Sequence, residues 1–97
     1  MTIGRARGSV VHGERYGVVV QASEFLPRSV VMVAPTSRSA RAASFRPDAH
    51  IAGQSTRVLV EQIGAVDSRS LGELIAHLTR EEMRGIDEAL RAVFGLT

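Results

Sequence analysis

The feature that most constrains the fold is a series of short valine-rich runs followed by one long amphipathic stretch. The runs are bounded by glycine, serine and proline, which favour turns, so each run is predicted to be a strand. The predicted strands span residues 8–13, 16–23, 28–37 and 56–66, and a weaker edge strand lies within 41–51. Pro35 is expected to end the third strand, and Pro47 to mark a bend. Strands first and helices last favour an α+β domain built on a small curled, mostly antiparallel sheet or barrel.

Two helices are predicted in the last third of the chain. Residues 70–73 fit a capping box that would open a short helix, which Gly72 weakens. Residues 79–82 fit a second capping box, and this helix should end at Gly95. Its apolar residues recur at helical spacing and should pack against the open side of the sheet. They are Met83, Ile86, Leu90, Val93 and Phe94.

The length and composition limit the class of protein. The 97 residues suffice for one domain, which is predicted to span residues 1–97. There is no Cys, which excludes disulfides, thiol catalysis and Cys-ligated metal sites. The longest apolar run, residues 30–35, is too short to cross a bilayer, and the first residues lack the apolar core of a signal peptide. A soluble cytoplasmic protein without membrane contact is therefore expected.

The charges are unevenly distributed. Residues 1–57 carry eight Arg and three acids, a net charge of +5, whereas residues 58–97 carry four Arg and seven acids, a net charge of −3. All basic residues are Arg, whose planar fork of donors suits phosphate, although a GC-rich genome would produce the same choice. The basic half predicts a surface for a polyanion. The alternative is a small barrel with its charges spread evenly.

Polar side chains lie at the ends of three predicted strands. They are Arg15 with His12, then Thr36 and Ser37 followed by Arg38 and Arg41, and finally Glu61 with Gln62. If these strands are neighbours, an arginine, a hydroxyl and an acid meet at one rim of the sheet. Each stretch also has a purely structural explanation. These explanations are an ordinary turn at Arg15, a closing turn after Pro35, and an ion pair between Glu61 and Arg57 or another arginine.

Such a set of side chains suits cleavage of RNA without a metal. A base must remove the proton from a ribose 2′-hydroxyl, and a cation must stabilise the charge that grows on the phosphoryl oxygens. An arginine supplies the cation, a carboxylate or histidine the base, and a hydroxyl can hold a phosphate oxygen. The three histidines share no ligand spacing, and the sequence gives no reason to expect a metal or cofactor.

From Arg7 onward the chain resembles the MazF/PemK family of toxins. The resemblance rests on the order of the valine strand after a basic residue, "VAPTS", "VLVEQIGAVDSRSL" and the pattern of the last helix. It implies a CcdB/MazF-like fold and a small homodimeric endoribonuclease. Such proteins cut single-stranded RNA at short sequences without a metal, and an acidic antitoxin segment blocks them.

The resemblance also implies roles for particular residues. Arg15 would be the catalytic arginine, Thr36 or Ser37 the catalytic hydroxyl, and Glu61 or His12 the group that transfers protons. The remaining candidates would bind RNA, and they are Arg38, Arg41, Arg57 and Gln62.

The chain departs from the family pattern in its first loop, which is much shorter. Two other functions remain open on the same fold. One is a CcdB-like toxin directed at DNA gyrase, although the terminal "FGLT" lacks the Trp-Gly-Ile ending of those toxins. The other is an inactive binding module.

Overall fold

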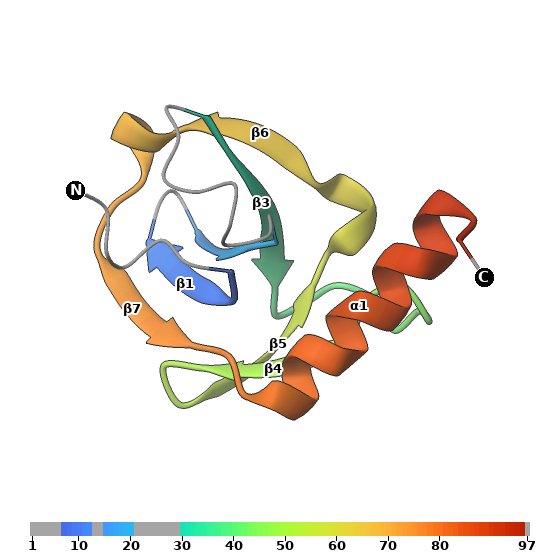
Figure 1. Cartoon of the computed structure of the whole chain (residues 1–97). Coiled ribbons are helices and arrows are strands. Elements are labelled where there is room, and N and C mark those ends of the chain that lie inside the picture. Colours follow the sequence, from blue (N-terminus) through green and yellow to red (C-terminus); the bar gives the residue numbers. More distant parts are fainter. Residues whose placement is uncertain (1–6, 13–14, 21–29, 97) are drawn as a thin grey trace.

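The strands form one curled antiparallel sheet that closes nearly into a barrel, with a single α-helix beside it (Figure 1). The computed structural model describes residues 7–12, 15–20 and 30–96. Its strands are β1 (Ser9–His12), β2 (Tyr16–Val19), β3 (Val30–Ser37), β4 (Asp48–Ile51), β5 (Gln54–Val58), β6 (Gly64–Asp67) and β7 (Leu74–His77). Its helices are the 3-10 turns η3 (Val60–Gln62) and η4 (Ser68–Ser70) and the α-helix α1 (Arg80–Phe94). The predicted α+β class is confirmed.

The strand order is β4-β5-β3-β2-β1-β7, and β6 also pairs with β3. The long strand β3 changes partner along its length. Residues 30–33 pair with β6, residues 33–35 with β2, and residues 36–37 with β5. The end of β3 therefore lies where strands from distant parts of the sequence meet.

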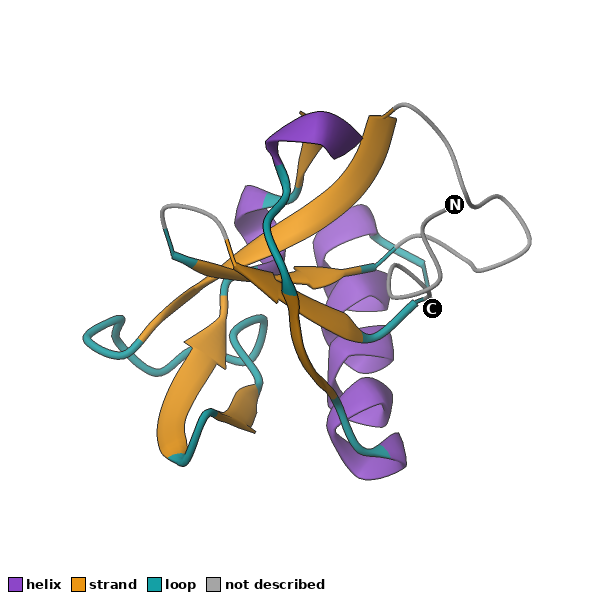
Figure 2. Ribbon diagram, turned by 90° about the vertical axis from the view of Figure 1, so that its left-hand side faces the viewer, coloured by secondary structure: helices purple, strands orange, loops and turns teal. Residues whose placement is uncertain are grey.

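The main core lies between the sheet and α1. Val10, Val18 and Val58 are fully buried there and pack in one cluster with Ile86 of α1. Valine suits this position because its branched side chain is stiff and packs well on a pleated surface. An ion pair between Arg7 and Asp87 joins the segment before β1 to α1. Figure 2 shows α1 running along one side of the barrel.

Both predicted ends of α1 are confirmed. The Thr79 hydroxyl accepts from the Glu82 backbone N–H at 3.1 Å, and the Glu82 carboxylate accepts from the Thr79 N–H at 2.8 Å. Gly95 ends the helix in the left-handed region, with φ of 70°. The same Glu82 carboxylate accepts from the backbone N–H of His50 at 2.8 Å, which attaches the start of α1 to β4.

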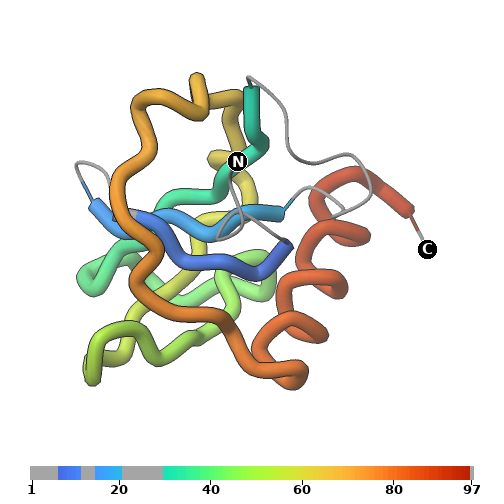
Figure 3. Tube along the Cα trace, turned by 60° about the vertical axis from the view of Figure 1, so that its left-hand side comes forward, coloured from blue at the N-terminus to red at the C-terminus, as the bar shows by residue number. Residues whose placement is uncertain are grey.

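The predicted helix from Ser70 is wrong. The chain makes only the single turn η4, which the Asp67 carboxylate caps, and then enters β7. β7 pairs with β1, so that Val10 faces Ala76 across the ladder, and Figure 3 shows the orange β7 beside the blue β1. This pairing satisfies the hydrogen-bonding groups of the β1 backbone. The stabilisation it gives outweighs the weak local preference of the residues after Ser70 for a helix.

Two details of the predicted strands also need correction. Pro35 does not end β3, because a proline lacks only the N–H, and its carbonyl accepts from the Leu59 N–H at 2.8 Å. The predicted strand over 56–66 is broken, since β5 ends at Val58 and β6 begins at Gly64. The short edge strand is confirmed as β4, directly after Pro47. Residues 13, 21–23 and 28–29, at the ends of three other predicted strands, lie outside the described residues.

No helix within residues 7–12, 15–20 and 30–96 is both long and apolar enough to cross a membrane.

Candidate active site

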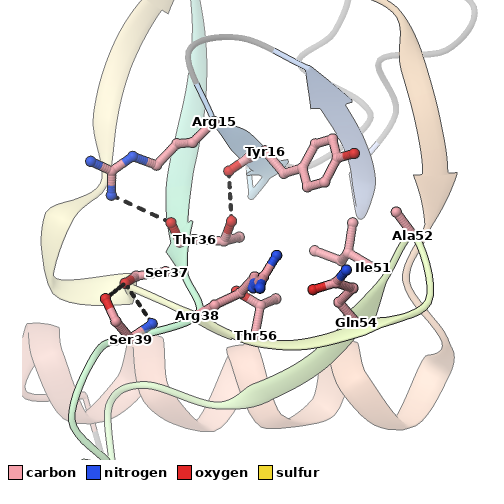
Figure 4. Close-up of a pocket in the computed structure, with 10 residues that line it drawn as sticks. All are labelled: Arg15, Tyr16, Thr36, Ser37, Arg38, Ser39, Ile51, Ala52, Gln54 and Thr56. Atoms are coloured by element: carbon pink, nitrogen blue, oxygen red, sulfur yellow. Dashed lines mark hydrogen bonds between the residues drawn. The ribbon is translucent and has the colours of Figure 1, made fainter.

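Two adjoining cavities share Arg15 and Tyr16 in their walls. The first, called the polar cavity below, has a volume of about 550 Å³. It is lined by Arg15, Tyr16, Thr36, Ser37, Arg38, Ser39, Ile51, Ala52, Gln54 and Thr56 (Figure 4). The second, called the apolar cavity, has a volume of about 490 Å³. It is lined by Val11, Arg15, Tyr16, Gly17, Val33, Pro35, Gln62, Gly64, Val66, Ser70 and Leu71.

Arg15 lies directly before β2, and its side chain is anchored to the end of β3. Its Nη1 donates to the Thr36 carbonyl at 3.4 Å, while the residue as a whole stays exposed. Figure 4 shows Arg15 and Tyr16 pointing in opposite directions, as successive side chains at a strand should. The pairing of β2 with β3 therefore brings Arg15 to Thr36 and Ser37, as the sequence predicts.

The two candidate hydroxyls differ in what they can offer a ligand. Thr36 is buried, and its hydroxyl donates to the Tyr16 carbonyl at 2.9 Å, so its proton is committed to the fold. Ser37 is half-buried, and its Oγ accepts from the Ser39 backbone N–H at 3.3 Å. Ser37 is thus the more accessible hydroxyl, while Thr36 holds β2 and β3 together.

The described residues that line the polar cavity carry positive charge. Arg15 and Arg38 are exposed, and none of these described lining residues is acidic. Arg41 is also exposed but does not line it. Arginine with nearby hydroxyls is the donor set that binds phosphate well. Among the residues that the structure describes, no three His, Asp or Glu side chains group as a metal site would require.

Glu61 does not line either cavity. It lies in η3, where its Oε2 accepts from Arg46 Nε at 3.0 Å and from Arg46 Nη2 at 2.8 Å. Burial disfavours the charged carboxylate, but the hydrogen bonds and charge of Arg46 outweigh it and lower the pKa of Glu61. Arg46 is therefore the arginine of the structural ion pair that the sequence left open. The neighbouring Gln62 is exposed and lines the apolar cavity beside Arg15.

Two other candidate site residues are Arg57 and His12. Arg57 is half-buried, donates to the Ala40 carbonyl at 2.8 Å, and forms an ion pair with Asp48 at 3.5 Å. The backbone of His12 pairs with Tyr16 at the end of β1, but its side chain lies outside what the structure describes.

The sequence did not identify the wall of the polar cavity that comes from the hairpin of β4 and β5. Ala52 and Gly53 form its two-residue turn, with φ values of 54° and 77°, between the paired residues Ile51 and Gln54. The sequence feature that could have indicated this hairpin is Gly53, which lies between two short stretches that become β4 and β5. Its docking against β3 depends on long-range pairing, which no local pattern reveals.

Comparison with known sequences gives two matches. Residues 2–94 match the family described as the PemK-like, MazF-like toxin of type II toxin–antitoxin systems. Rv3098A, a candidate toxin of Mycobacterium tuberculosis (strain ATCC 25618 / H37Rv), is 38% identical over 91 residues. These residues cover 93% of this chain and 85% of the relative.

Solved structures share the fold over nearly the whole chain. An endoribonuclease from a mycobacterial species, in complex with its cognate antitoxin, gives a TM-score of 0.85 and covers 95% of this chain and 96% of its own. Mycobacterium tuberculosis toxin MazF-mt6 gives 0.83, covering 94% and 99%. A chain of the MazE–MazF structure from Deinococcus radiodurans gives 0.80, covering 95% and 97%. Their identities to this chain, 17%, 18% and 19%, make these likenesses evidence of fold alone.

Proposed function

The chain belongs to the PemK-like, MazF-like toxins of type II toxin–antitoxin systems, and on that basis we propose that it acts as an endoribonuclease. Its substrate would be single-stranded RNA, cut at short sequences in the cytoplasm without a metal ion, so that translation and growth stop. The observation that carries this proposal is the polar cavity. There, the exposed Arg15 and Arg38 lie with Thr36 and Ser37, and none of the described residues that line the cavity is acidic.

The reaction would be an internal transfer at one phosphodiester. The ribose 2′-oxygen attacks the adjacent phosphorus, a base takes the 2′-hydroxyl proton, and the bond to the 5′-oxygen breaks as that oxygen gains a proton. The products are a 2′,3′-cyclic phosphate and a free 5′-hydroxyl. Arg15 would stabilise the charge on the phosphoryl oxygens, and Ser37 would orient one of them. Thr36 supports this arrangement by binding the Tyr16 carbonyl.

The proton-transfer group would be one of the two sequence candidates. Glu61 is bound to Arg46 and lines neither cavity, which leaves His12 as the candidate for this role. The backbone of His12 pairs with that of Tyr16, and Tyr16 lines both cavities.

The two cavities together would hold successive parts of an RNA strand. The polar cavity suits a phosphate, and the apolar cavity, with Val33, Val66 and Leu71 in its walls, suits the flat face of a base. Arg15 belongs to both walls and would therefore lie at the phosphate between them. Gln62 could then hydrogen-bond the edge of the base.

The chain would have two protein partners. One is a second copy of itself, as the family resemblance implies. The other is an acidic antitoxin, and two of the structurally similar toxins were solved with their antitoxins. Its carboxylates would meet the same arginines as RNA phosphates do, so the antitoxin would compete with RNA.

The test is incubation of the purified protein with defined single-stranded RNA in EDTA, with the cut ends identified chemically. A cyclic phosphate and a 5′-hydroxyl at one short sequence would support the proposal. Inhibition of gyrase supercoiling without RNA cleavage would instead assign the chain to the gyrase-directed toxins. Neither activity, with RNA still bound, would identify an inactive binding module.

A further inference from the structure

Two arginines bind backbone carbonyls of the loop that joins β3 to β4. This loop, residues 38–47, carries the exposed Arg38 and Arg41. Arg46 Nη1 donates to the Arg41 carbonyl at 3.2 Å, and Arg57 Nη1 donates to the Ala40 carbonyl at 2.8 Å. Among the described residues, the only backbone hydrogen bond within the loop runs from Arg46 N to Ala43 O, at 3.0 Å. The loop thus depends on arginine side chains for its conformation.

Each of these arginines is held in turn by an acid, but the two pairs differ in burial. Arg46 donates twice to Glu61 Oε2, and each side chain of this pair is 24% exposed. Arg57 contacts Asp48, whose side chain is 84% exposed. A shielded pair with two hydrogen bonds holds its geometry more firmly than an exposed pair. The Arg46 guanidinium also lies 5.5 Å from the centre of the Phe45 ring.

Glu61 lies in a part of the chain that is attached to the core and to β3, so it can hold Arg46 in place. It lies in η3 between Val60, which is buried in the main core, and Gln62. The chain just before it is attached to β3 by the hydrogen bond from Leu59 N to Pro35 O. Arg46 belongs to the loop, whereas Glu61 belongs to η3, whose Val60 is buried in the core.

We propose that Glu61 is a positioning residue, which acts through Arg46 to hold the 38–47 loop so that Arg38 and Arg41 face the ligand. The arginines of this region then divide into two classes. Arg46 and Arg57 fix the loop, and Arg38 and Arg41 bind the polyanion. Glu61 Oε2 is occupied by two donors, and Oε1 is buried without a hydrogen-bond partner among the described residues. Neither oxygen is arranged to meet a ribose hydroxyl in the polar cavity.

The first test measures the loop itself and needs no RNA. Glu61→Gln keeps the size of the side chain but removes its charge, so hydrogen exchange of the two hydrogen-bonded loop amides, those of Ser39 and Arg46, should accelerate about fivefold or more. Asp67→Asn, which removes the exposed carboxylate paired with Arg69, is the matched control and should leave the loop unchanged. Unchanged exchange in Glu61→Gln would overturn the proposal.

A second variant keeps the test decisive if Glu61→Gln unfolds. Arg46→Lys retains the charge but loses the fork that gives two hydrogen bonds to one oxygen. It should accelerate exchange in the same amides at least as much, because it also loses the hydrogen bond to the Arg41 carbonyl. When both variants fold, the two effects should add only in part in the double variant, because both changes break the contact between Arg46 and Glu61. Additive effects would count against a shared role.

The second test rests on the proposed function, because it uses RNA. With RNA made uncleavable by 2′-deoxy substitution, Glu61→Gln should bind about three- to tenfold more weakly, with the same slope of log affinity against log salt. Arg38→Gln and Arg41→Gln should each reduce that slope by about 0.7, because each loses a phosphate contact. An equal loss of slope in Glu61→Gln would contradict indirect action.

The kinetics of RNA cleavage distinguish a positioning role of Glu61 from a catalytic role. As a positioning residue, Glu61 affects KM, so Glu61→Gln should keep kcat within about threefold and retain the shape of the pH profile. A general base would instead lose about 100-fold in kcat together with the acidic limb of that profile, and this result would overturn the proposal. If the wild-type protein neither binds nor cuts RNA, the proposed function fails, while the exchange experiment still decides the role of Glu61.

Discussion

Arg15 is the residue on which the proposed chemistry depends most directly. It is exposed, and among the described residues its side chain makes one long hydrogen bond, to the Thr36 carbonyl at 3.4 Å, so we expect the fold not to rely on it. Arg15→Ala should reduce kcat for RNA cleavage on the order of 100-fold or more, with unchanged thermal unfolding. Arg15→Lys should recover little of this loss, because lysine lacks the bidentate fork. Cleavage by Arg15→Ala at the wild-type rate would remove Arg15 from the mechanism.

Ala52 is a residue whose backbone is unfavourable for its side chain. It occupies the left-handed region, with φ of 54°, in the turn that borders the polar cavity. Asparagine tolerates this conformation better than alanine does, so Ala52→Asn should raise the free energy of unfolding by about 0.5–1 kcal/mol. Urea titration at fixed protein concentration measures the change. Gly53→Ala, at φ of 77°, is the opposite control and should lower stability.

At the scale of single residues, the sequence predicted which side chains gather at the candidate site but not which partner each of them binds. Arg15, Thr36 and Ser37 follow from the rule that functional side chains gather where strands end, and β2–β3 pairing brings them together. The partner of Glu61 could not be chosen in advance. Several arginines were available, and only the path of the 38–47 loop selects Arg46.

Among the elements, the start of α1 is attached to β4 by the carboxylate of Glu82. Burial disfavours the charged form of Glu82, but hydrogen bonds from the backbone N–H groups of Thr79 and His50 outweigh it and lower its pKa. A lowered pKa means that ionised Glu82 stabilises the fold above the ordinary value of 4.5 and that this contribution is lost as the pH falls.

The pH dependence of Glu82→Gln tests this attachment. The variant should lose about 1 kcal/mol of stability at pH 7, the size of a helix-cap contribution, and the difference from wild type should shrink as the pH falls below the ordinary pKa of 4.5. Chemical unfolding followed across this pH range measures both. Glu81→Gln, at an exposed position in the same turn, serves as control. A difference that stays constant down to pH 2 would exclude Glu82 ionisation as the cause.

The two predicted helices show why one element could be recognised and the other could not. Both began with a capping-box pattern, yet only the stretch after Thr79 continues with apolar residues at helical spacing over four turns. The stretch after Ser70 is short and contains Gly72, so its local preference is weak. The edge of β1 that does not face β2 has backbone groups to pair, and pairing with them stabilises residues 74–77 as the strand β7 rather than as a helix.

On the scale of the whole molecule, apolar side chains remain at the surface. Val30 and Met32 on β3 are 48% and 36% exposed, and Phe94 and Leu96 at the end of α1 are 61% and 63% exposed. A second copy would cover such surface, so sedimentation should show a dimer at micromolar concentration. Phe94→Asp should shift the protein toward monomer without unfolding it. A monomeric wild-type protein would contradict the homodimer.

The pairing of β1 with β7 joins strands from opposite ends of the chain, Ser9 beside His77. The long segment between these strands must lose conformational entropy before their pairing can stabilise the fold. The pairing is therefore expected to form late and slowly during folding. A growing chain on the ribosome already contains Arg15, Thr36 and Arg38, but it lacks the strand that completes the barrel and the helix that fills its core. We therefore expect a chain of this topology to be unable to cut RNA until β7 and α1 have been made and have joined the barrel.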